Sequence, residues 1–104
     1  MKTHAAVVLT LVLASPGAAT AADGARIFAD TCQACHQANL TGGYVGPPLD
    51  GVGERLFSGY IYSYLKNPQK IKPAVPEPNR NLSDTDARAL TAYLVSLPVP
   101  KERR

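Results

Sequence analysis

Residues 31–37 read TCQACHQ and hold both cysteines of the chain, Cys32 and Cys35, with His36 directly after the second. Two thiols two residues apart beside an imidazole fit four kinds of site. They are a structural zinc site, a redox-active dithiol, a plain disulfide, and covalent attachment of a c-type haem. The rest of the chain decides among these four.

The N-terminal residues have the order of a secretory signal. Lys2 supplies a positive charge, residues 5–14 (AAVVLTLVLA) are apolar, SPG at 15–17 ends that run, and small residues precede Asp23. A helix that crosses a bilayer needs about 20 apolar residues, so this run is too short for a span. The order predicts a cleaved signal peptide over 1–22 and a periplasmic protein. The domain then covers 23–104, which is 104 − 22 = 82 residues.

Size and charge narrow the class of protein. Without Lys2, ten Lys and Arg stand against eight Asp and Glu, a mild excess with no basic stripe that would indicate nucleic-acid binding. A domain of this size rarely has a core that stabilises it well, and such domains often recruit a disulfide, a metal or a cofactor.

Helical segments are expected at 24–34, at 56–67 up to Pro68, and at 84–97, where Ser83 and Asp86 resemble a capping box. No segment alternates like a strand for long, so the fold class predicted is all-α. Two Pro- and Gly-rich loops at 41–53 and 68–82 separate the helices. Loops this long in a small domain usually wrap something or are functional.

Three of the four interpretations of TCQACHQ fit poorly. Zinc needs four ligands, and only Cys32, Cys35 and His36 remain once His4 leaves with the signal. A thioredoxin-like dithiol belongs near a βαβ pattern, which is not visible. A disulfide would close a very short loop and leave His36 unexplained. Haem attachment explains the pattern: on a helix the two cysteines share one face, and His36 comes beneath the iron.

On these residues the chain resembles the class I c-type cytochromes, over nearly all of 24–97. GARIF at 24–28 resembles the start of the family's N-terminal helix. There Gly24 and Phe28 meet an aromatic of the last helix, matched by Tyr93. CQACH matches the haem motif. GPPLDGVGER, YLKNPQK and PNRNLSDTDARALTAYLVSL match the later segments. The resemblance implies three main helices wrapped around one haem c, attached covalently through Cys32 and Cys35.

Roles carry over from the resemblance by position. His36 matches the proximal iron ligand, and Pro47 the proline whose carbonyl accepts the histidine Nδ1 hydrogen, which fixes its tautomer. Arg55 matches an arginine that commonly pairs with a haem propionate. Tyr64 matches a tyrosine near the sixth position of the iron. For Pro47, Arg55 and Tyr64 the plainer readings are a turn proline, a surface arginine and a core aromatic.

The family's usual sixth ligand, a methionine before the last helix, is missing. Val75-Pro76 stands where Met-Pro would be expected, and the one methionine, Met1, leaves with the signal. The iron is then five-coordinate or takes another ligand, for which the candidates are Lys70, Lys72, Asn79, Asn81 and Tyr64. A solvated face is the plainer reading of the lysines. A ligand-deleted variant of an ordinary cytochrome is a further explanation.

Electron transfer is the function expected, with no enzymatic activity. The partners expected are periplasmic redox proteins, a dehydrogenase or an oxidase, and Lys66, Lys70 and Lys72 could steer them. Loss of the axial methionine predicts a lower reduction potential. The alternatives are a haem protein whose open site binds NO, CO, O₂ or peroxide, and an electron-transfer subunit of a larger dehydrogenase. No nucleic acid and no membrane span are expected for the mature chain.

Overall fold

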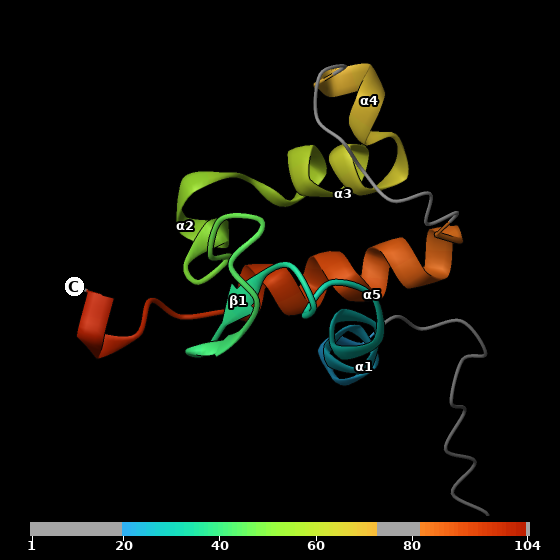
Figure 1. The fold of residues 1–104 in the computed structure, drawn as a ribbon. Coiled ribbons are helices and arrows are strands. Elements are labelled where there is room, and N and C mark those ends of the chain that lie inside the picture. The colour runs from blue at the N-terminus through green and yellow to red at the C-terminus, as the bar shows by residue number, and fades with distance from the viewer. Residues whose placement is uncertain (1–19, 73–81, 104) are drawn as a thin grey trace, which may run out of the picture.

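The computed structural model describes residues 20–72 and 82–103. The proposed signal up to residue 19, and the segment that holds Val75, Pro76, Asn79 and Asn81, lie outside the described residues. The described part is mostly helical, which confirms the all-α class (Figure 1). Its elements in chain order are α1 (Ala21–Thr31), β1 (Gln37–Ala38), β2 (Thr41–Gly42), α2 (Val52–Arg55), α3 (Ser58–Lys66), α4 (Pro68–Ile71), α5 (Asp84–Ser96) and the 3-10 turn η1 (Lys101–Arg103).

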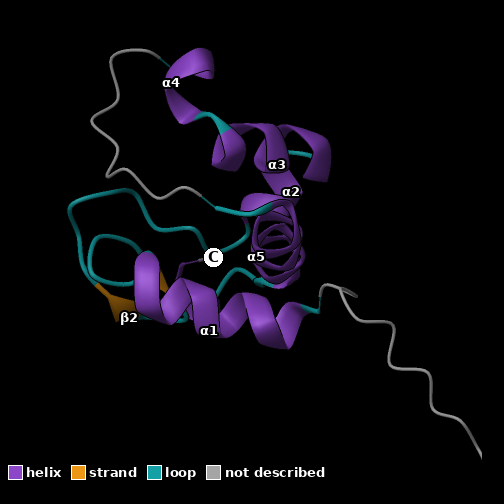
Figure 2. Ribbon diagram, turned by 90° about the vertical axis from the view of Figure 1, so that its right-hand side faces the viewer, coloured by secondary structure: helices purple, strands orange, loops and turns teal. Residues whose placement is uncertain are grey.

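The crossing of α1 and α5 is the centre of the fold. Figure 1 shows α5 running across the view with α1 seen end-on against it, and Figure 2 shows α1 running across the view with α5 seen end-on. A side chain at Gly24 would overlap the Ala89 carbonyl and come within 2.6 Å of Tyr93 Cβ, so only glycine allows this close approach. The rings of Phe28 and Tyr93 lie 5.4 Å apart beside it. This is the helix contact that the resemblance implied.

The core continues from this crossing to α2 and α3. Its buried apolar side chains come from α1, β1, α2, α3 and α5 and from the residues just after α1 and α5, and Leu90 is fully enclosed. Each main helix turns one apolar face toward this core, as amphipathic helices of a small globular protein do. The members are Ile27, Phe28, Cys32, Ala38, Val52, Ile61, Leu65, Ala89, Leu90, Leu94 and Leu97.

The helix ends confirm some expected boundaries and correct others. Ser83 is the N-cap of α5, and its hydroxyl accepts the Asp86 N–H at 3.1 Å. The helix expected from residue 56 begins at Ser58, because Leu56 has extended backbone after the short helix α2. Pro68 does not simply end the helical region. It opens α4, since proline suits the first position of a helix.

The two strands, of two residues each, pair as an antiparallel hairpin, with Gln37 opposite Gly42 and Ala38 opposite Thr41. The connecting residues Asn39 and Leu40 have φ of 50° and 62°. Positive φ at both central residues is the backbone of the turn that joins a two-residue hairpin. This hairpin directly follows His36 and starts the first of the two expected loops.

Candidate functional site

The cysteine motif lies on a turn after α1, which corrects the expectation that it lies on a helix. α1 ends at Thr31, and Cys32 is its C-cap. The Phe28 carbonyl accepts from both Cys32 N (2.8 Å) and Gln33 N (2.9 Å). The Cys32 carbonyl then accepts from Cys35 N (3.1 Å) and His36 N (2.9 Å). One further turn of chain therefore keeps the two cysteines and the histidine together even though the helix has ended.

The two thiols differ in burial. Cys32 is 6% exposed and belongs to the apolar core, whereas Cys35 is exposed and His36 is half-buried. The two cysteines form no disulfide with each other. A motif with one sulfur in the core and the other at the surface spans the boundary between core and solvent. A group bound to both sulfurs would cross that boundary too.

The segment 43–50 runs beside the motif in the same direction. Gly43 N donates to the Gln33 carbonyl at 2.9 Å, and Gly46 N to the Cys35 carbonyl at 2.7 Å. Further on, Leu49 N donates to the Gln37 carbonyl at 2.9 Å. This Pro- and Gly-rich stretch is thus fixed along the cysteine motif by backbone bonds, although it has no regular secondary structure.

His36 is held from two sides. Its Nδ1 lies 2.8 Å from the Pro47 carbonyl oxygen, the hydrogen bond that the resemblance implied. A carbonyl oxygen only accepts, so Nδ1 carries the ring proton and Nε2 presents its lone pair. A side chain at Gly46 would overlap the ring, within 2.7 Å of Nδ1 and 2.8 Å of Nε2. The loop backbone therefore lies directly against the imidazole.

Arg55 lies on α2 and Tyr64 lies on α3. Arg55 is exposed at the end of α2, and its Nη1 donates to the Asp50 carbonyl at 3.0 Å. Tyr64 is half-buried on α3, next to the buried Leu65. Their roles toward a propionate and toward the sixth position of the iron stay predictions.

Of the three lysines that were expected to steer partners, Lys66 forms an ion pair within the protein. The Lys66 ammonium lies 2.9 Å from Asp84 Oδ1 and donates to the Leu82 carbonyl at 3.0 Å. Lys66 therefore ties α3 to the start of α5. Lys70, in α4, and Lys72, just after it, are exposed.

Two residues that sequence reasoning missed support the site. Gly46 lies within the quoted GPPLDGVGER segment, and Gly next to Pro in a loop is a signal for close backbone approach. Asp50 lies in the same segment and is only 5% exposed, with Oδ1 2.6 Å from Asn39 N. No sequence signal shows that this aspartate is buried, because aspartate in a turn is usually solvated.

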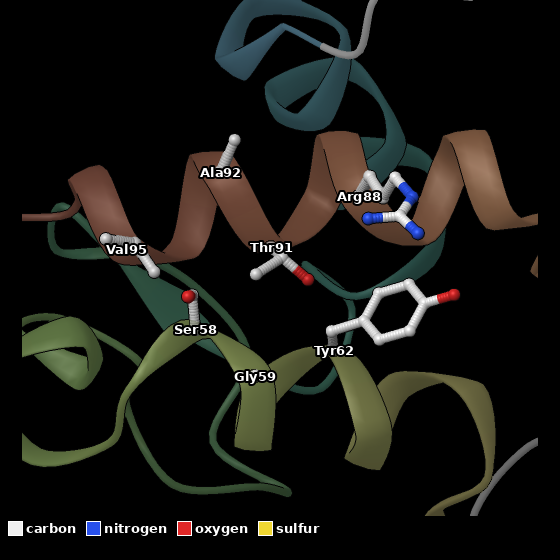
Figure 3. A pocket seen from close by; sticks show the side chains of 7 residues that line it. All are labelled: Ser58, Gly59, Tyr62, Arg88, Thr91, Ala92 and Val95. Carbon is white, nitrogen blue, oxygen red and sulfur yellow. The ribbon is translucent and has the colours of Figure 1, made fainter.

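A groove of about 440 Å³ lies between α3 and α5 (Figure 3). Its lining side chains are mostly small, and the Arg88 guanidinium carbon lies 5.0 Å from the centre of the Tyr62 ring at one end. The lining residues are Ser58, Gly59, Tyr62, Arg88, Thr91, Ala92 and Val95. They include no residue of the cysteine motif or of the segment beside it.

With the motif, the His36 tautomer and the crossing of α1 and α5 in place, the class of protein is a small helical domain built to carry a covalently bound haem. The chain belongs to the cytochrome c family: the family model described as cytochrome c matches residues 21–98. A search of curated proteins finds no match. Within 20–72 and 82–103, no helix is long and apolar enough to cross a membrane.

The cofactor is haem c, bound covalently through the pair Cys32 and Cys35. The residues of this chain fit it. The thiols are three residues apart on one turn, and neither is taken up in a disulfide with the other. The fixed tautomer of His36 leaves Nε2 as the nitrogen able to bind a metal ion. Members of this family carry electrons on such a group.

Proposed function

We propose that this protein is a periplasmic one-electron carrier in which His36 is the proximal ligand of the haem iron. The observation that carries the proposal is the bond between His36 Nδ1 and the Pro47 carbonyl, on a ring that follows the second cysteine of C-x-x-C-H. Haem c supplies an iron that alternates between the ferrous and ferric states. The chain supplies the attachment, the ligand and the partly apolar surroundings.

Each residue of the site has a proposed role. Cys32 and Cys35 hold the group, so that it cannot dissociate between partners. The Pro47 carbonyl keeps the His36 proton on Nδ1 and makes Nε2 a stronger donor, which favours the ferric state. Arg55 lies at the exposed end of α2, where we propose that it pairs with a propionate. Tyr64 is proposed to lie near the sixth position of the iron.

The test of attachment is chemical. The processed chain should have a mass equal to the polypeptide plus one haem, and acid–acetone should not extract that haem. Replacing both Cys32 and Cys35 with Ser should give extractable haem or none, because a serine hydroxyl forms no thioether with a vinyl group. Haem that extracts freely from the unaltered protein would refute the proposal.

The sixth position of the iron is proposed to lack a methionine. Val75 stands where the family's methionine is expected, and valine has no atom that binds iron. The ferric protein should then lack the long-wavelength thioether band and be at least partly high-spin. It should bind cyanide, imidazole or CO more readily than a methionine-ligated relative.

Val75→Met tests this directly, since methionine is long and flexible enough to reach the iron from this loop. The variant should show the thioether band, a low-spin iron, a higher reduction potential and weaker binding of added ligands. An unchanged variant, together with an altered spectrum in Lys70→Ala or Lys72→Ala, would mean that a lysine already occupies the position. Lys66→Ala serves as the control for these two lysine variants, because the Lys66 ammonium is bound to Asp84.

A second candidate function rests on the same valine. An open sixth position would bind NO, CO, O₂ or peroxide, with Tyr64 as the plausible donor to a bound molecule. Electron transfer remains the stronger proposal, because residues 20–72 and 82–103 hold no second histidine that could activate a bound ligand, and members of the family carry electrons. Rapid reduction and oxidation by redox proteins, with CO binding too weak to compete, would support the carrier.

Its partners are proposed to be periplasmic redox proteins, either a dehydrogenase or an oxidase, and the chain could also serve as a subunit of such an assembly. Since Lys66 is paired, Lys70 and Lys72 are the cations proposed to attract an acidic docking face. Replacing both with Gln should slow association at low ionic strength and have little effect at high salt.

A further inference from the structure

Two short segments lie side by side at the proposed proximal face, joined by three hydrogen bonds. They link His36 Nδ1 to the Pro47 carbonyl (2.8 Å), Leu49 N to the Gln37 carbonyl (2.9 Å), and Asn39 N to Asp50 Oδ1 (2.6 Å). The first bond holds the histidine, and the third closes the far end of the pairing. Of the three acceptors, only that of Asp50 is a side-chain carboxylate.

The turn that Asp50 holds is a strained one. Asn39 and Leu40 both have positive φ, at 50° and 62°. Asparagine tolerates this region, but a bulky side chain such as that of Leu40 is rarely found there. Such a conformation persists only where the surrounding structure imposes it. The short bond from the Asn39 N–H to the Asp50 carboxylate ties this turn to the neighbouring segment and so helps to impose its conformation.

The burial of Asp50 makes that bond more important. The residue is 5% exposed, and a carboxylate so enclosed must be compensated by hydrogen-bond donors. Arg55 Nη1 donates to the Asp50 carbonyl at 3.0 Å and brings a positive charge to the same residue. Burial raises the pKa of Tyr93, and the negative charge of Asp50 adds to this rise.

We propose that Asp50 is a positioning residue for His36: its carboxylate locks the hairpin turn to the segment 47–50 and so keeps the Pro47 carbonyl at His36 Nδ1. The inference rests on the proposed function, in which His36 binds the haem iron. Asp50 acts through the backbone of two neighbouring segments and not by contact with the haem. Removal of its acceptor should therefore loosen a hydrogen bond that Asp50 itself does not make.

The test uses the haem-loaded ferrous protein and two substitutions. Asp50→Ala removes the acceptor, whereas Asp50→Asn keeps an oxygen in the same place and removes the charge. The readout is the rate at which the His36 Nδ1 proton exchanges with solvent, measured by NMR. Asp50→Ala should speed the exchange by about tenfold or more, and Asp50→Asn should leave it within about twofold of the original.

The reduction potential gives a second readout. A weakened bond at Nδ1 makes His36 a poorer donor and raises the potential, so Asp50→Ala should lie above Asp50→Asn. Equal exchange rates in Asp50→Ala and the unaltered protein would overturn the proposal. Equal acceleration in both variants would also overturn it, because the charge and not the hydrogen bond would then be responsible.

A double variant covers the case in which Asp50→Ala does not fold. Leu40→Gly removes the strain of the turn, so Leu40→Gly/Asp50→Ala should fold and should exchange the His36 proton faster than Leu40→Gly, because the acceptor of the Asn39 N–H is still missing. The single variant Leu40→Gly should exchange like the unaltered protein. A double variant that exchanged the proton no faster than Leu40→Gly would overturn the proposal.

Failure of the proposed function would look different. A ferrous spectrum without an iron-bound His36 ring would contradict both the function and the role of Asp50. An iron-bound ring whose proton exchange is insensitive to position 50 would overturn the role of Asp50 alone.

Discussion

His36 is fixed by backbone more than by side chains. The Pro47 carbonyl holds one ring nitrogen, and the backbone of Gly46 lies against the ring face. Glycine is needed at position 46 because a larger residue would overlap the His36 ring, and not because the backbone has an unusual φ.

Gly46→Ala should destabilise the haem-loaded protein by about 1–3 kcal/mol, because the added methyl overlaps the His36 ring and either the ring or the loop must move. Urea unfolding measures the loss. The absorption spectrum and the reduction potential should change as well, since the ring is the proposed iron ligand.

Gly59→Ala is the matched control for that substitution. Gly59 lies inside α3, and its added methyl would meet only the Phe57 ring, at 3.6 Å. Alanine is the better helix former, so this variant should gain about 0.5–1 kcal/mol and keep its spectrum. If both variants lost stability equally, contact with His36 could not be the cause at position 46.

At the scale of elements, α3 and α5 are joined by a small polar cluster at the start of α5. The Asp84 carboxylate accepts from Tyr62 Oη at 3.0 Å and pairs with the Lys66 ammonium. Arg88 stacks on the Tyr62 ring one turn further on (Figure 3). Lys66 also caps the Leu82 carbonyl, so the cluster fixes the point at which the chain enters α5.

The cluster predicts a pH dependence. The hydrogen bond from Lys66 lowers the pKa of Asp84 from 3.8, with a further contribution from Tyr62. A lowered carboxyl pKa gives stability that is present above 3.8 and lost as the pH falls through the pKa of the folded state. The hydrogen bond to Asp84 raises the pKa of Lys66 from 10.5, so its contribution is present below 10.5 and is lost as the pH rises through the raised pKa.

Asp84→Asn should therefore unfold at a lower urea concentration than the unaltered protein at about pH 7, and the gap should close at about pH 2. The effect is small, because both groups are exposed to solvent and salt. Asp30→Asn is the control: its partner Arg26 lies 3.9 Å away and both side chains are more than two-thirds exposed, so no change is expected. A gap that persisted in acid would exclude the ion pair as its cause.

At the scale of the whole molecule, the described helices are held together mainly by their contacts with α5. The main contacts are those of α1, α2 and α3 with α5, while the regular secondary structure between His36 and α2 is limited to the short hairpin of β1 and β2. One cysteine of the motif already lies in the core. The haem is therefore expected to complete a core that the protein alone leaves small.

The haem-free polypeptide should accordingly be largely unfolded. A group that is bound only in the folded state stabilises that state, and a covalent group cannot dissociate. Circular dichroism of chain made without haem should show little helix and no cooperative melting, whereas the haem-loaded protein should show both. A helical apoprotein that melts cooperatively would mean that the crossing of α1 and α5 suffices by itself.

Much of this was accessible from sequence because it depends on local chemistry. The pattern C-x-x-C-H specifies the cofactor, the Ser83 hydroxyl specifies the start of α5, and periodic leucines specify its buried face. Gly24, Phe28 and Tyr93 were found through the resemblance, and the structure places them together. The helix expected from about residue 56 starts two residues later, at Ser58, whereas its end before Pro68 is confirmed, since helix ends depend on small differences between competing backbone bonds.

By itself, then, the sequence determined the class of fold, the covalent haem and the absence of methionine at position 75. These follow from residue identity and spacing. Only the tertiary structure decided that the motif lies on a turn, that Lys66 is paired with Asp84, and that Asp50 is buried against Asn39. Each of these joins groups from different parts of the chain or depends on where a helix stops. Such contacts arise from packing between segments, and no local pattern records which distant group a charged side chain will meet.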